Sequence, residues 1–269
     1  MRTGMEASSP QQRTMSISLE TMLIALNAAL YAGIGYLTYL GIFAPLFGTV
    51  RFWPVVFIPA LFTVLFSPKI GAAGAGIGIF ISDMLIHGNA LLSLTVGVPA
   101  NVLGFYILGV AYRAAKRWNP QPTLGGLLIA PLAAVSLVSA YLLSGEPAVA
   151  TFFLAVAGAS VGIGALLMLA LAGFSIGGGL AYTAIRHENA RLLASSSLGL
   201  LVGSAIIGVG VWAYSQFLAL PSGLINAPLY AALVLFLWTY LSEIPFLVAL
   251  LPPLVKAVKR AMPAWMRQD

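Results

Sequence analysis

The feature that most constrains the fold is a series of long apolar segments, separated by short polar turns, between about residues 18 and 251. A run of about 20 apolar residues is as long as a helix that crosses the hydrocarbon core of a membrane. The segments lack the short alternating pattern of transmembrane β-strands. Since 60% of the 269 residues are hydrophobic and only 7% are charged, we expect an all-α integral membrane protein.

Eight apolar segments can be delimited along the chain. They lie at approximately residues 18–40, 52–67, 70–88, 90–112, 123–143, 148–185, 193–218 and 225–251. The second is short for a crossing, and the sixth is too long for one straight helix with a rise of about 1.5 Å per residue. An inward-projecting helix, or a break near the sequence LAGFSIGGG, would absorb the excess. We therefore predict a bundle of about eight transmembrane helices.

The polar ends of the chain and its basic residues predict the topology. Residues 1–17 lack the apolar core of a signal peptide and are expected to form a disordered tail, followed by one transmembrane domain at 18–258 and a basic tail at 259–269. With the N-terminus placed inside, all 13 Lys and Arg residues except Arg51 fall on the inner side. Because cytoplasmic loops are enriched in Lys and Arg, both termini are expected in the cytoplasm of a multi-pass cell-membrane protein.

An aspartate and a histidine interrupt the apolar run at residues 78–101. Asp83 and His87 are four positions apart and therefore share a helical face, toward the outer end of the third segment. Ionisable groups are costly in hydrocarbon, so they indicate an outward-facing polar pocket. Asn89 and Arg51 are expected nearby. The alternative is structural: Asp83 bonds to a neighbouring helix or caps a turn, and His87 is only a solvated side chain.

The loop at residues 41–53 is expected to cover this pocket, because it combines glycines with Phe43, Phe47 and Trp53, which would exclude water. Asn101 follows a proline that frees a backbone carbonyl, and it serves either the pocket or the contact between helices. Glu243 is either a proton or ion site or a structural carboxylate. The predicted substrate-binding residues are Arg51, Trp53, Asp83, His87, Asn89 and Asn101.

Several kinds of chemistry find no support in the sequence. The chain has no cysteine and two histidines, His87 and His187, on opposite sides of the expected bundle. Neither a metal cluster nor a catalytic triad can be assembled from this set, so we expect no enzyme, no metal site and no cofactor. The sequence GAGIG lacks the lysine and the spacing of a nucleotide-binding loop. The basic residues are scattered in ones to threes, which argues against nucleic-acid binding.

Small residues recur four positions apart at Ala25 and Ala29, at Ala28 and Ala32, and at Gly74 and Gly78. Such spacing allows another helix to approach closely. Ordinary internal packing and a docking face for another subunit both use it.

Residues 48–109, with the ending at 245–261, resemble the substrate-binding membrane subunit, or S component, of energy-coupling factor (ECF) transporters. The shared pattern is a lid loop after the first helix, a short second helix that ends near Pro68-Lys69, and a third helix stepped with glycines. The resemblance implies capture of a vitamin or similar micronutrient outside, and docking to a transmembrane coupling subunit and two cytosolic ATPases. It implies docking through Ala25 and Ala29, with Ala28 and Ala32 as the competing register. It also implies a core of six helices, with extra helices at about 148–218.

The main alternative is a self-contained secondary transporter or channel for a small solute. Such a protein needs coupling groups near the membrane midplane and usually an internal repeat. No repeat is evident, and Asp83 and Glu243 are the carboxylates that would carry protons.

Overall fold

The structure is a computed structural model that describes residues 15–41, 53–115, 170–181 and 187–262. The elements in these ranges are α1 (Ile17–Gly41), η1 (Pro54–Val56), α2 (Phe57–Leu65), α3 (Pro68–Ile86), α4 (Ala90–Leu92), the π-helical turn η2 (Ser93–Gly97), α5 (Val98–Ala114), a helix at Ala170–Ala181, α9 (His187–Ser215) and α10 (Tyr230–Ala261).

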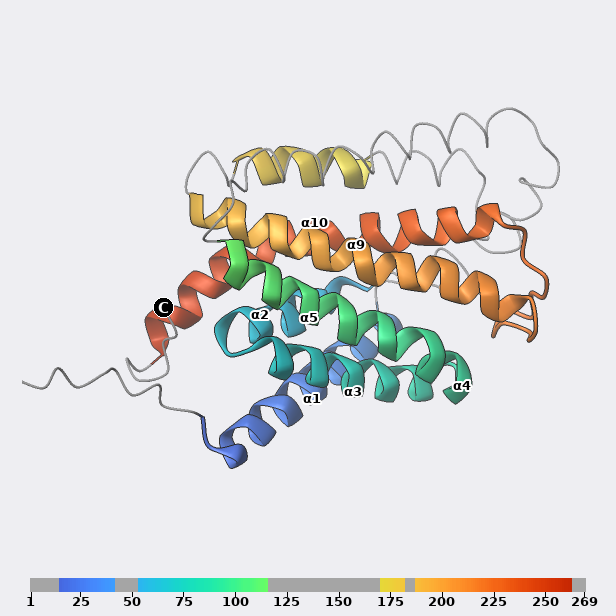
Figure 1. The fold of residues 1–269 in the computed structure, drawn as a ribbon, viewed down its shortest axis with the longest axis horizontal. Coiled ribbons are helices and arrows are strands. Elements are labelled where there is room, and N and C mark those ends of the chain that lie inside the picture. Colours follow the sequence, from blue (N-terminus) through green and yellow to red (C-terminus); the bar gives the residue numbers. More distant parts are fainter. Residues whose placement is uncertain (1–14, 42–52, 116–169, 182–186, 263–269) are drawn as a thin grey trace, which may run out of the picture.

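Five of the described helices are long and apolar enough to cross a membrane: α1, α3, the continuous stretch Ala90–Ala114, α9 and α10. They lie roughly along one direction as a bundle (Figure 1). The prediction of a multi-pass helical membrane protein is confirmed. The predicted count of eight spans stays a prediction, because the segment at 123–143 and most of the segment at 148–185 lie outside the described residues.

Some predicted boundaries need correction. The last helix begins at Tyr230 instead of residue 225 and continues past residue 251 to Ala261. The preceding residues form a turn because Asn226 adopts a positive φ of 54° and its amide donates to the carbonyl of Ser215 at 2.7 Å. Pro252 and Pro253 do not end the helix, since packed helices tolerate prolines in transmembrane segments. The stretch LAGFSIGGG lies within one continuous helix, Ala170–Ala181.

The point at which α3 ends places the polar residues of the third span near one end of the bundle. Ser67 caps the start of the helix by accepting the amide hydrogen of Ile70 at 3.1 Å, with Pro68 at the first helical position. The helix ends because Gly88 adopts a positive φ of 66°, and its amide donates to the Asp83 carbonyl at 3.0 Å. This left-handed conformation suits glycine. Asp83 therefore stands in the last turn of α3.

Glycines in α3 let α1 approach closely. A Cβ at Gly74 would lie 2.5 Å from Cγ of Asn27, and one at Gly78 would lie 2.9 Å from the Ala28 carbonyl oxygen. The fully buried Asn27 uses this space to donate to the carbonyls of Ile70 at 3.2 Å and Gly71 at 3.1 Å. The small residues predicted to allow close helix approach in α3 thus serve packing within the chain.

A second close contact joins α5 to α9. A Cβ at Gly199 would lie 2.7 Å from Cβ of Leu108, and one at Gly203 would lie 3.1 Å from the Ala100 carbonyl oxygen. On its other side α9 contacts α10, where the Ser197 and Tyr240 hydroxyls are 2.6 Å apart. Because α9 lies between α5 and α10, it positions residues of three helices around one space.

The described basic residues all lie toward one end of the bundle, where α1 starts and where α5 and α10 end (Figure 1). They are Lys69, Arg113, Arg191, Lys256, Lys259 and Arg260. The opposite end carries Asp83 and His87. This distribution agrees with the predicted asymmetry and makes the Asp83 end the expected outer end.

We expect both termini to be cytoplasmic. Cysteines introduced at positions 5 and 266 of this cysteine-free chain should resist a membrane-impermeant maleimide in intact cells, because the reagent does not cross the bilayer. Ser222→Cys is the matched control: it lies in the exposed turn between α9 and α10, at the opposite end, and should be labelled. Labelling at position 5 or 266 in intact cells would contradict this topology.

Candidate functional site

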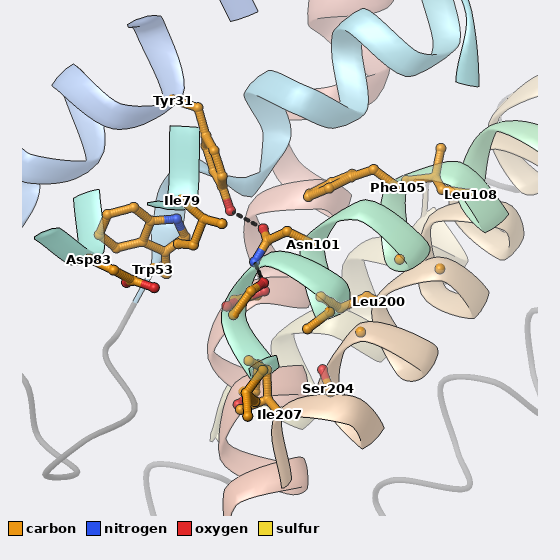
Figure 2. A pocket seen from close by; sticks show the side chains of 18 of the residues that line it. Tyr31, Trp53, Ile79, Asp83, Asn101, Phe105, Leu108, Leu200, Ser204 and Ile207 are labelled. Atoms are coloured by element: carbon orange, nitrogen blue, oxygen red, sulfur yellow. Dashed lines mark hydrogen bonds between the residues drawn. The ribbon is translucent and has the colours of Figure 1, made fainter. Parts of the chain in front are cut away.

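A cavity of about 110 Å³ lies between the helices, lined by residues of α1, α3, α5, α9 and α10 together with η2 and Trp53. Most of its wall is apolar. The polar side chains in the wall include Asp83, His87, Asn101, Ser204, Thr239 and Glu243. Figure 2 shows side chains from segments far apart in the sequence converging on this space. An apolar cavity with a few convergent polar groups is the usual form of a small-molecule site.

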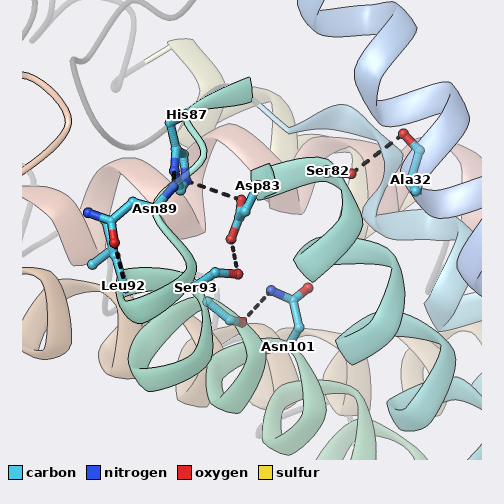
Figure 3. A network of polar contacts seen from close by, with 9 residues as sticks. Ala32, Ser82, Asp83, His87, Asn89, Leu92, Ser93 and Asn101 are labelled. Atoms are coloured by element: carbon cyan, nitrogen blue, oxygen red, sulfur yellow. Dashed lines mark hydrogen bonds and ion pairs between the residues drawn. The ribbon is translucent and has the colours of Figure 1, made fainter. Parts of the chain in front are cut away.

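The carboxylate of Asp83 is held in a defined position. Its side chain is buried, and Oδ2 accepts a hydrogen bond from the hydroxyl of Ser93 at 2.6 Å (Figure 3). Oδ1 lies 3.5 Å from Nε2 of His87, one turn further along. A Cβ at Gly97 would lie 2.8 Å from Oδ2, so glycine at this position leaves room for the carboxylate. The π-helical turn η2 contributes both Ser93 and Gly97. Such turns are frequent at functional sites.

His87 and Asn89 link the end of α3 to the start of α4. Nδ1 of His87 accepts the amide hydrogen of Asn89 at 3.1 Å, which directs the other ring nitrogen toward Asp83. The side chain of Asn89 caps α4 by accepting the amide hydrogen of Leu92 at 3.0 Å. Its Nδ2 lies 3.1 Å from the hydroxyl of Tyr214 in α9. Asn89 therefore has a structural role here and is not among the residues that line the cavity.

Asn101 connects α5 to α1 at the cavity wall. Its Oδ1 accepts a hydrogen bond from the hydroxyl of Tyr31 at 2.7 Å, and its Nδ2 donates to the Gly97 carbonyl at 2.9 Å. Asn101 therefore joins two helices, and it also lines the cavity; its role in substrate binding stays a prediction.

Three aromatic side chains form part of the wall. The ring of Tyr31 meets that of Trp53 edge-on at a centroid distance of 5.9 Å and that of Phe105 at 6.3 Å. A Cβ at Gly35 would collide with the ring of Trp53, so this glycine accommodates the indole against α1. Trp53, expected in a cover for the pocket, is buried in the wall instead.

The structure brings together four of the six predicted substrate-binding residues: Trp53, Asp83, His87 and Asn101 line the cavity. Asn89 lies beside it, whereas Arg51 and the loop at 42–52 lie outside the described residues. Sequence reasoning missed Tyr31, Phe105 and Ser204, which carry no charge and no distinctive spacing. Glu243 could be found from the sequence, because a carboxylate in a transmembrane helix indicates a functional site. It lines the cavity from α10.

The alanine side chains of α1 differ in their solvent exposure. Ala28 and Ala32 are buried at 3% and 4% exposure and face α3. Ala25, Ala29 and Gly33 are exposed in one row, and a Cβ at Gly33 would meet nothing within 4 Å. The stripe at 28 and 32 is therefore used inside the chain, whereas in the described part of the chain the stripe at 25 and 29 is exposed.

Together, the helices and the cavity define a multi-pass helical membrane protein with a polar and aromatic cavity between its spans. The chain is similar to the UPF0397 protein PBPRA2239 of Photobacterium profundum, with 39% identity over 95 residues. The match covers 34% of this chain and 50% of that protein, so the chain spans about half the length of the curated relative it matches. No family model and no solved structure match the chain.

Replacing Asn101 with alanine is expected to lower the melting temperature of the purified protein without ligand. The change removes the hydrogen bonds that join Asn101 to the Tyr31 hydroxyl and to the Gly97 carbonyl, and each such bond contributes about 0.5–1.5 kcal/mol to stability. Thr95→Ala is the matched control, because Thr95 is exposed and bonds only within its own helix. Equal melting temperatures for the Asn101 variant and the unmodified protein would contradict the structural role.

Proposed function

We propose that the chain is the membrane-embedded substrate-binding subunit of an ATP-dependent, ECF-type uptake transporter for a vitamin or a related small micronutrient. The proposal rests first on the cavity, which five spans enclose and which holds Asp83 close to the expected outer end. A subunit that captures a solute outside needs a binding site reachable from that side. The resemblance of residues 48–109 and 245–261 to S components supports the same function.

The observation that carries the proposal is the hydroxyl of Ser204. The residue is fully buried and lines the cavity, and its Oγ has no hydrogen-bond partner in the described part of the chain. Ser196, two turns earlier in α9, donates to the Leu192 carbonyl at 2.8 Å instead. An unpaired buried hydroxyl is unfavourable, so a ligand or water in the cavity is needed to satisfy it.

The exposed row of Ala25 and Ala29 on α1 is the proposed docking face for the coupling subunit. The apolar side chains that flank this row, among them Met22 and Leu26, are exposed as well. ATP hydrolysis would be supplied by the cytosolic ATPase subunits, which would bind the coupling subunit at the basic end of the bundle.

Mild-detergent purification from native membranes tests this function. Mass spectrometry should identify a stoichiometric small molecule released on denaturation, together with ATPase subunits that carry Walker motifs. Recovery of the folded chain with neither of them would overturn the proposal.

A second function is favoured by one observation: Asp83 and Glu243 line the same cavity. Two carboxylates in one transmembrane cavity are suited to proton-coupled secondary transport. The two functions differ in a simple experiment, since a secondary transporter in proteoliposomes accumulates its solute with a proton gradient and no other subunit. The ECF-type subunit alone does not.

A further inference from the structure

The hydroxyl of Ser204 does not make the hydrogen bond that is usual for a hydroxyl inside a transmembrane helix. Ser175, Ser196 and Thr239 each donate to the carbonyl four residues earlier, at 2.7, 2.8 and 2.8 Å. Ser204 is fully buried, and in the described part of the chain its Oγ has no hydrogen-bond partner. Ser195 in the same helix is equally unpaired there, but it is not among the residues that line the cavity. A partner for Ser204 therefore has room to bind in the cavity.

A second donor lies at the same depth on the neighbouring helix. A Cβ at Gly203 would lie 3.1 Å from the Ala100 carbonyl oxygen, so the residues that follow these two, Ser204 and Asn101, lie at one level of α9 and α5. Both line the cavity (Figure 2). The Nδ2 of Asn101 carries two N–H groups, and one of them donates to the Gly97 carbonyl at 2.9 Å. At this level the cavity wall thus contains two uncharged donor groups, a hydroxyl and an amide.

The apolar wall beside Ser204 favours an uncharged acceptor. Leu200 and Ile207, one turn away on either side in α9, line the cavity together with Phe105 of α5. A carboxylate loses far more hydration energy than a neutral carbonyl on entering apolar surroundings. A neutral carbonyl oxygen accepts a hydrogen bond from the hydroxyl at a smaller cost in hydration. The group that complements Ser204 is therefore a ketone, amide or similar carbonyl on a molecule with an apolar body.

We propose that the cavity binds a compact neutral molecule through a carbonyl oxygen, which accepts a hydrogen bond from the Ser204 hydroxyl near the middle of α9. The apolar body of the ligand lies against Leu200 and Phe105, in a cavity of about 110 Å³. This class of ligand rests on the proposed function of the chain as a substrate-binding subunit. Ser204 determines specificity, because an analogue without the acceptor leaves the buried hydroxyl unpaired.

Two probes of nearly the same shape test the proposal: acetophenone, and α-methylstyrene, in which a CH₂ group replaces the carbonyl oxygen. Each is titrated against the purified full chain in nanodiscs, with the rise in melting temperature as the readout. Each probe is compared with itself between variants, so that its partition into lipid cancels. Ser204→Ala should weaken acetophenone binding about two- to tenfold, as expected for one hydrogen bond, and should not weaken α-methylstyrene binding. Benzoate should bind the unmodified chain more weakly than acetophenone.

Ser195→Ala is the matched control. It also removes an unpaired buried hydroxyl from α9, but from a residue outside the cavity lining, so it should leave the binding of both probes unchanged. The infrared band of the acetophenone carbonyl is a direct readout, because a hydrogen bond to the oxygen moves the stretch to lower wavenumber. The shifted band should appear with the unmodified chain and with Ser195→Ala, and it should be absent from nanodiscs of lipid alone and from Ser204→Ala. If Ser204→Ala does not fold, the band with the unmodified chain still decides whether the carbonyl is hydrogen-bonded.

The outcomes separate this inference from the proposed function. Equal weakening of both probes by Ser204→Ala, or a lower melting temperature of this variant without probe, would overturn the role of the hydroxyl as a ligand donor. Tighter binding of benzoate than of acetophenone would overturn the preference for a neutral group. Binding of none of the probes would overturn the inference together with the cavity as a small-molecule site. Failure of carbonyl recognition in a chain that copurifies with ATPase subunits would leave the ECF-type function in place, whereas carbonyl recognition without any ATPase partner would sustain the inference and remove that function.

Discussion

On the proposed ECF-type function, Ala29→Trp is expected to abolish uptake and the recovery of coupling and ATPase subunits, while the purified chain keeps its melting temperature. The side chain of Ala29 is exposed in the row with Ala25 and Gly33. Because Ala29 is exposed, a tryptophan there is expected to leave the packing of the described chain intact, but it prevents close approach of another helix backbone, which depends on small residues. The readouts are uptake by cells and the amount of Walker-motif ATPase that copurifies with the tagged chain.

Ala28→Trp is the matched comparison, because it places the same large side chain on the neighbouring face of the same helix. Ala28 is 3% exposed, and its carbonyl lies against the position of Gly78 in α3. A large side chain there should lower the melting temperature, because overpacking of a closely packed contact costs about 1–3 kcal/mol or more. If Ala29→Trp and Ala25→Trp both leave uptake and subunit recovery unchanged, α1 does not dock through this face.

Gly199→Ala is expected to destabilise the protein strongly and to weaken ligand binding with it. An added Cβ would lie 2.7 Å from Cβ of Leu108 and 3.0 Å from its backbone nitrogen, so α5 and α9 would have to separate. The cost is about 1–3 kcal/mol, measured as a lower melting temperature in detergent. Gly199 also lines the cavity, so separation of the helices changes the site.

Gly173→Ala is the matched control for Gly199→Ala. Gly173 lies in the helix Ala170–Ala181, and an added Cβ would meet nothing within 4 Å. The substitution should leave the melting temperature unchanged or raise it slightly, because alanine is favoured over glycine in helices by about 1 kcal/mol. Equal effects of the two substitutions would contradict the close contact between α5 and α9.

The sequence by itself determined the class of fold and one end of the site. Hydrocarbon offers no hydrogen bonds to the backbone, so long apolar segments must be helical. Charge is costly there, so the positions of Asp83 and His87 within an apolar segment are enough to indicate a cavity wall. Both consequences follow from local composition and from spacing along one helix. They therefore require no knowledge of which helices are neighbours.

Only the tertiary structure decided which residues share the cavity and which alanines are buried. Tyr31 and Asn101 are 70 residues apart in the chain and meet because α1 and α5 both pack on α3. The spacing of alanines in α1 allows either Ala25 and Ala29 or Ala28 and Ala32 to pack within the chain. It is Ala28 and Ala32 that are buried, because the glycines of α3 lie against that face. Asn89 is adjacent in sequence to the site, yet the turn at Gly88 directs it toward capping. Such choices depend on contacts between distant segments, and neighbouring sequence carries no information about them.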